Sequence, residues 1–108
     1  HAQRLHPRAD ARHAITHVAA QASPVAARFK ALDVIADGHP VPKAFFDVGA
    51  RSTSSSDYPV RDFFPLVRIA TGVRNGVPLE AMIASHTIDA AHLLFLEKQI
   101  GSIEPGKK

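Results

Sequence analysis

The fold prediction begins at residues 34–40, where the chain reads VIADGHP. Three apolar residues, two of them β-branched, are followed by Asp-Gly, a pattern typical of a short buried strand that ends in a turn. Apolar side chains at helical spacing lie on both sides, at Phe29 and Leu32 before the strand and at Phe45 and Val48 after it. Helix, strand and helix in succession predict an α/β fold with parallel strands, because strands that alternate with helices form βαβ units.

The same rhythm continues in both directions along the chain. The predicted strands cover residues 14–18, 34–36 and 51–56, and the predicted helices cover residues 24–32, 42–48, 66–73, 78–86 and 88–96. The spacing of Leu79, Met82 and Ile83 predicts that one face of the helix from residue 78 is buried. Residues 1–14 are polar and basic, and we expect a loop or a short irregular helix there.

Composition limits what the chain can be. With 108 residues, 45% of them hydrophobic and 21% charged, it fits one globular domain and is too short for a complete eight-stranded barrel. The absence of cysteine excludes disulfides, thiolate zinc sites and thiol catalysis. No apolar run is long enough to cross a membrane, and the first residues lack a signal-peptide core, so we expect a cytoplasmic protein with no membrane partner. The net charge of +3 comes from dispersed basic residues, and we expect no nucleic-acid partner.

A side chain that can bind a metal or carry a proton stands at or just after the end of each of the three predicted strands. These side chains are His17, His39 and Asp57. In parallel α/β folds the carboxyl ends of the strands carry the active site, and imidazole and carboxylate groups are common ligands. The alternative is that Asp57 caps a turn before a proline and that the histidines are ordinary surface or hydrogen-bonded residues. The regular placement of the three residues is what favours a metal or acid–base site.

Several stretches of the chain, in a fixed order, resemble one known family. They are RHAITH (12–17), VIA (34–36), DVGARSTSSSDYPV (47–60), LEAMI with TIDAA (79–91) and IGSIEPGK (100–107). Together they resemble the C-terminal part of a metal-dependent amidohydrolase. The subgroup that they resemble most contains formamide-deformylase-like and N-acyl amino-acid deacylase-like enzymes.

This resemblance implies a partial (β/α) barrel, made of about the last three βα units and the C-terminal helices. Residues 1–108 would form one domain, with the βα units at 10–77. Residues 78–108 would form the C-terminal helices and the start of a linker to a β-domain that is missing here. We therefore expect a C-terminal fragment, or a shortened gene product, of such an enzyme.

The resemblance also implies roles for individual residues. Asp57 matches the catalytic carboxylate, which binds the metal and activates water, and His17 matches a metal-binding histidine. Tyr58 and His39 match positions that border the substrate. The implied cofactor is a divalent metal, zinc by expectation, and the implied reaction is hydrolysis of a non-peptide C–N bond in a small amide by a metal-activated water. Thr16 departs from the family, which has Glu there, and the family's remaining ligands belong to earlier strands.

A different outcome is also consistent with this resemblance. Three strands cannot close a barrel, and an open parallel sheet exposes apolar strand faces and two edges. The alternative hypothesis is therefore a non-catalytic chain that forms a homo-oligomer through these exposed edges and binds metal weakly or not at all.

Overall fold

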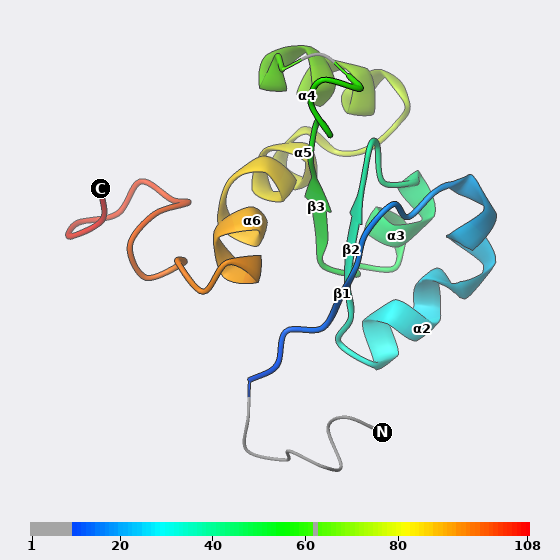
Figure 1. Cartoon of the computed structure of the whole chain (residues 1–108), viewed down its shortest axis with the longest axis horizontal. Helices are drawn as coiled ribbons and strands as arrows, with labels where there is room; N and C mark the ends of the chain where they lie inside the picture. The colour runs from blue at the N-terminus through cyan, green and yellow to red at the C-terminus, as the bar shows by residue number, and fades with distance from the viewer. Residues whose placement is uncertain (1–9, 62) are drawn as a thin grey trace.

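The computed structural model describes residues 10–61 and 63–108 and shows a three-stranded parallel sheet surrounded by helices (Figure 1). Most of the N-terminal segment for which we expected a loop or short helix lies outside these residues. The strands are β1 (Ala14–Ile15), β2 (Ile35–Gly38) and β3 (Ser52–Ser54). The helices are the 3-10 helix η1 (Ala20–Val25), α2 (Ala26–Ala31), α3 (Lys43–Asp47), α4 (Pro65–Arg74), α5 (Leu79–His86) and α6 (Ile88–Leu93).

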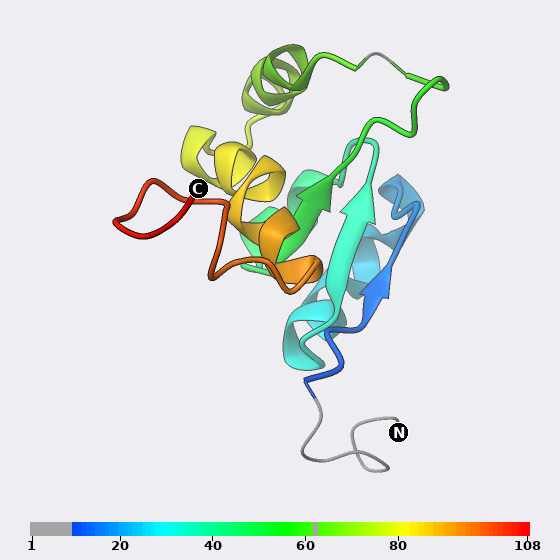
Figure 2. The same ribbon diagram turned by 60° about the vertical axis from the view of Figure 1, so that its left-hand side comes forward.

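The strands lie in chain order, β1-β2-β3, and all point the same way (Figure 2). Ala14 pairs with Ile35, and Gly38 pairs with Ser54. Backbone contact continues beyond β1, because the Val18 N–H donates to the Asp37 carbonyl over 2.9 Å. The carboxyl ends of all three strands therefore meet at one edge of the sheet.

The main core lies between the sheet and the helices η1, α2 and α3. Phe45 of α3 is fully buried, and its ring meets Phe29 of α2 edge-on with centroids 5.0 Å apart. The other buried members are small or β-branched residues: Val18, Ala26, Ala36, Val41 and Ala50. Small residues let the short helices approach the sheet closely.

The C-terminal helices pack on the other side of β3. Arg51, just before β3, donates to the Asp89 carboxylate in the first turn of α6 over 2.8 Å. Helices α4 and α5 lie so close that a Cβ on Gly72 would come within 2.3 Å of the Met82 sulfur. This close approach explains why glycine occupies this position in the last turn of α4.

Several predicted elements differ from the observed ones at their ends or faces. The first helix begins earlier than residue 24, with a 3-10 turn, and the last ends at Leu93 rather than at residue 96. On α5, Met82 is buried as predicted, but Leu79 and Ile83 are 53% and 45% exposed, so that prediction is wrong for two of its three residues. Their exposure follows from the placement of α5, which contacts α4, α6 and β3 mainly through its Met82 and Ser85 side.

Candidate metal centre

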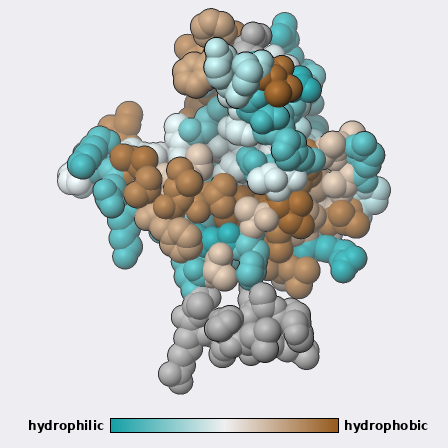
Figure 3. All heavy atoms as spheres, viewed as in Figure 1, coloured by the Kyte–Doolittle hydropathy of each residue, from teal (hydrophilic) through white to brown (hydrophobic). Residues whose placement is uncertain are grey.

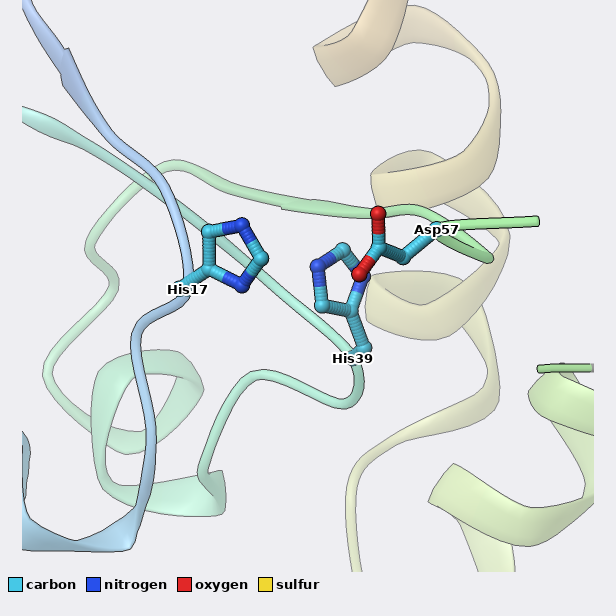
Figure 4. Close-up of side chains that lie close together, drawn as sticks. All are labelled: His17, His39 and Asp57. Carbon is cyan, nitrogen blue, oxygen red and sulfur yellow. The ribbon is translucent and has the colours of Figure 1, made fainter. Parts of the chain in front are cut away.

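Three side chains from the ends of the three strands come together at the edge described above (Figure 4). His17 follows β1, His39 follows β2 and Asp57 follows β3. One donor atom from each residue lies within 4.8 Å of the other two. Within residues 10–61 and 63–108 this is the one group of three or more such side chains that could hold a metal ion.

The backbone turns sharply at two of the three residues. His17 has φ 57° and Asp57 has φ 52°, both in the left-handed region. His and Asp enter this region more readily than most residues, because their short polar side chains suit tight turns. The Asp57 turn is closed by the Val60 N–H, which donates to the Asp57 carbonyl over 2.8 Å. Each turn directs the side chain away from its strand and toward the cluster.

Gly38 lets β2 approach the end of β1 closely. A Cβ at this position would lie 2.6 Å from the Val18 carbonyl oxygen. This distance is too short for a real contact, and a backbone atom cannot move away without shifting the strand. Glycine therefore brings the residue before Val18 and the residue after Gly38 together. The rings of His17 and His39 have centroids 5.0 Å apart and meet edge-on.

His39 is oriented by Ser55. Its Nδ1 lies 3.1 Å from the Ser55 carbonyl oxygen and 2.8 Å from the Ser55 hydroxyl. Both contacts with Ser55 involve one ring nitrogen, and a ring nitrogen of His39 points toward His17 (Figure 4). Metal-binding histidines are commonly held in this way by a hydrogen bond at their second nitrogen.

The donor set could hold a divalent metal cation. Catalytic zinc takes about three protein ligands, often two histidines and a carboxylate, at about 2.0–2.2 Å from the ion. Ligands of one tetrahedral ion would then lie about 3.4 Å apart. In the structure the three donor atoms lie within 4.8 Å of one another, which is near that spacing.

The cluster lies in a hollow of about 490 Å³, which is within the usual size of a small-molecule site. Its wall is mostly apolar, and it is lined by Val18, Ala19, Ala20, Pro40, Pro42, Val60 and Arg61 in addition to the three donor residues. The hollow can therefore hold a small molecule against the cluster.

The predicted site residues have different surroundings in the structure. His17 and Asp57, expected as metal ligands, lie together in the hollow, and His39, expected to face the substrate, lies among the donors. Tyr58 is 70% exposed, its ring packs edge-on against Phe63 with centroids 6.0 Å apart, and it does not line the hollow. Tyr58 therefore lies outside the wall of the hollow in this structure.

Sequence reasoning missed Ser55 and Arg61. Ser55 belongs to a serine run that reads poorly as a strand, but the register that pairs Gly38 with Ser54 places the next two residues, His39 and Ser55, side by side. Ser55 could have been found from the sequence, because His39 and Ser55 each stand one residue after a pair of aligned strand residues. Arg61 had no signal of its own, because its place in the hollow depends on the path of the loop after β3.

Comparison with known proteins gives one structural match. No protein-family model matches the chain, and no curated protein sequence matches it. The chain superposes on the crystal structure of an amidohydrolase from Thermotoga maritima MSB8 with a TM-score of 0.76 and 24% identity. The match covers 87% of this chain and 29% of the Thermotoga chain, so this chain spans less than a third of that protein. The fold is therefore amidohydrolase-like, in the form of parallel strands joined by helices.

Proposed function

We propose that this chain is a metal-dependent hydrolase that cleaves the C–N bond of small non-peptide amides. The observation that carries the proposal is the meeting of His17, His39 and Asp57 inside a hollow of about 490 Å³. The amidohydrolase-like fold supports it, because the fold brings these residues to the carboxyl ends of its strands. We further propose that the chain belongs to the subgroup with formamide-deformylase-like and N-acyl amino-acid deacylase-like enzymes.

His17, His39 and Asp57 would hold the cation, and two imidazoles with one carboxylate suit zinc. Such a cation supplies Lewis acidity, which polarises a carbonyl group and makes water more acidic. His39 would bind through Nε2, because Ser55 occupies Nδ1. Ser55 thus acts as a positioning residue.

Asp57 would be the catalytic base. A carboxylate has two oxygens, so one can bind the cation while the other accepts a proton from the attacking water. The water oxygen forms a bond to the amide carbon, the C–N bond breaks, and Asp57 passes the proton to the leaving nitrogen. Tyr58, on the same exposed turn, would border the substrate from outside the hollow.

The proposal is tested by replacing Asp57 with Asn and measuring metal content and hydrolysis together. We expect native mass spectrometry to find one zinc per wild-type chain, and we expect wild type to hydrolyse N-formyl or N-acyl amines. Asp57→Asn should abolish hydrolysis and leave the fold intact, because the change is nearly isosteric. Asp47→Asn is the matched control, since Asp47 lies on α3, is 51% exposed and pairs with Lys43; it should behave like wild type.

Two results would contradict the proposal. One is an Asp57→Asn variant that hydrolyses the substrates at the wild-type rate. The other is a wild-type chain that binds no zinc at stoichiometric concentration and hydrolyses none of these amides.

One observation favours the second candidate function, a non-catalytic chain that self-associates. Strand β1 is an edge of the sheet. Beside it lies a hollow of about 210 Å³ lined by the apolar side chains of Ile15, Val25 and Leu32, which are 51%, 38% and 55% exposed. Apolar residues also form a band across one face of the molecule (Figure 3). Unpaired edges and apolar patches favour association. The same mass spectra decide between the two, because this candidate predicts oligomers without bound zinc.

A further inference from the structure

We propose that helix α4 and the residues just before it form a surface that binds an anionic lipid membrane by lying flat on it. We call this surface, made of residues 58–61 and 63–74, the α4 surface. The proposal is carried by the exposed apolar side chains gathered there, by the arginines among them and by the length of the helix. It does not depend on the proposed hydrolase, because its test measures binding to vesicles and no reaction.

Large apolar side chains are exposed all along the first part of this surface. Those between residues 58 and 67 that are 54% to 78% exposed are Tyr58, Val60, Phe63, Phe64, Leu66 and Val67. Three of them are aromatic, and aromatic and leucine side chains are typical of segments that insert into the boundary between lipid headgroups and acyl chains. An exposed apolar patch of this kind marks a site of interaction with a membrane or another protein.

Helix α4 turns an apolar side to the solvent. The residues of this side follow the helical spacing i, i+1, i+4 and i+7, and all are exposed: Leu66, Val67, Ala70 and Val73. The opposite side carries Gly72, which is buried against Met82 of α5. The helix lies at the periphery of the molecule, away from the sheet (Figures 1 and 2). A helix of a globular protein usually turns its apolar side to the core, so this outward apolar side calls for a partner.

The charge of the segment selects the partner. Residues 58–75 contain three arginines, Arg61, Arg68 and Arg74, and one acidic residue, Asp62. Arg61 and Arg74 are exposed, and neither forms an ion pair within residues 10–61 and 63–108. A second copy of this chain would bring a surface of the same positive charge against the first, which opposes association. Anionic lipid headgroups instead attract basic side chains, each of which strengthens binding about fivefold.

The length of α4 indicates how it would lie. Its ten residues, Pro65–Arg74, span about 15 Å, which is half of the roughly 30 Å hydrocarbon core of a bilayer. The helix would therefore rest in the plane of the membrane surface with its apolar side sunk about 5–10 Å. The lack of a long apolar run predicted no membrane partner from the sequence, but a helix that lies on the surface needs no such run.

The experiment measures co-sedimentation of the full chain with two kinds of vesicle, one of phosphatidylcholine alone and one with about a third of phosphatidylglycerol. Two double variants test the two features of the surface: Phe63→Gln with Leu66→Gln removes apolar area, and Arg61→Gln with Arg74→Gln removes charge. Each has a matched control elsewhere on the molecule. Leu32→Gln with Leu94→Gln replaces two exposed leucines, and Lys30→Gln with Lys98→Gln removes two exposed charges.

We expect wild type to bind the anionic vesicles at least about tenfold more tightly than the neutral ones, because the segment carries a net charge of +2. The apolar double variant should lower binding to the anionic vesicles at least about tenfold, because a buried apolar side chain contributes that much or more. The arginine double variant should lower it to a similar extent, and so should about 1 M salt, which shortens the screening length to about 3 Å. Both control variants should bind like wild type.

Three results would overturn the proposal. One is the absence of binding to the anionic vesicles, or equal binding to both kinds. Another is wild-type binding by the apolar or the arginine double variant, of which the second decides the question if the first does not fold by circular dichroism. The third comes from light scattering without vesicles: a wild-type dimer that the change Phe63→Gln with Leu66→Gln converts to a monomer would show that a second copy covers this surface. None of these results bears on zinc binding or amide hydrolysis, which are measured separately.

Discussion

The side chain of Ser55 contacts His39 and helps to set the orientation of its ring. Its hydroxyl and its carbonyl oxygen both lie within hydrogen-bond distance of His39 Nδ1. Its own N–H donates to the Gly38 carbonyl over 3.3 Å, so its position is set by the sheet. The orientation of His39 is thus tied to the pairing of β2 and β3.

On the proposed function, replacing Ser55 with Ala should weaken zinc binding by about tenfold, because removing a group that orients a metal-binding histidine typically costs about 10- to 100-fold in affinity. The Ser55 carbonyl remains as an acceptor in this variant, which places the expected loss at the lower end. The measurement is competition for zinc with a chelator of known affinity.

Two further variants control for this effect. Ser55→Thr retains the hydroxyl and should restore most of the affinity. Ser102→Ala removes a hydroxyl that contacts Glu104 and Lys107 in the C-terminal segment, and it should leave zinc affinity unchanged. Wild-type affinity in Ser55→Ala would show that the hydroxyl does not position His39.

At the scale of the elements, burial separates residues that look alike in the sequence. Phe45 and Ile83 both occupy apolar positions of predicted helices, yet Phe45 is fully buried and Ile83 is 45% exposed. Helical spacing identifies an apolar face, but only the packing of the helix decides how much of that face is covered.

Phe45→Ala should therefore lower the free energy of unfolding by about 3–5 kcal/mol, the usual cost of removing a buried aromatic side chain. Ile83→Ala, the comparison variant, should cost less than about 1 kcal/mol, because an exposed side chain leaves no cavity. Urea denaturation followed by circular dichroism measures both. Equal losses in the two variants would show that α3 and α5 do not pack as described.

At the scale of the whole molecule, Arg12 joins the start of the described chain to its C-terminal part. Its guanidinium makes two 2.8 Å hydrogen bonds to the Glu97 carboxylate, also contacts the His92 carbonyl, and lies 4.0 Å from the centre of the Phe95 ring. The hydrogen bonds from Arg12 lower the pKa of Glu97 from 4.5 to about 2. Arg12 lies just before β1, so the Arg12–Glu97 pair lies at the end of the strands opposite the candidate metal centre.

This pair predicts a pH dependence of stability. A carboxylate whose pKa is lowered by folding stabilises the folded state above its unfolded pKa, and this contribution is lost as the carboxylate is protonated. We expect the contribution to be complete above about pH 4.5 and to disappear between about pH 4.5 and pH 2.

The Glu97→Gln variant isolates this effect, because other carboxylates titrate over the same range. The difference in Tm between wild type and Glu97→Gln should be largest above pH 5 and should shrink toward pH 2. A difference that stays constant over this range would show that the Arg12–Glu97 ion pair does not contribute. Thermal melts at a series of pH values provide the measurement.

The local pattern of the sequence was enough to predict the class of the fold. Apolar periodicity, Asp-Gly and Asn-Gly turns and prolines at helix starts are local signals, and the observed order of strands and helices matches the predicted order. Even the serine run was correctly predicted to be extended, because the rhythm of its neighbours required a strand there. The family resemblance agrees with the amidohydrolase-like fold at the level of architecture.

Residue pattern alone was enough to predict the elements, their parallel arrangement and the positions of His17, His39 and Asp57 at strand ends. The distance of at most 4.8 Å between their donor atoms, the contact of Ser55 with His39, the place of Arg61 but not Tyr58 in the hollow, and the exposure of Ile83 emerge only from the folded chain. Periodicity and turn chemistry act over a few residues. The register of neighbouring strands, the path of a loop and the covered side of a helix are set by contacts between segments far apart in the chain.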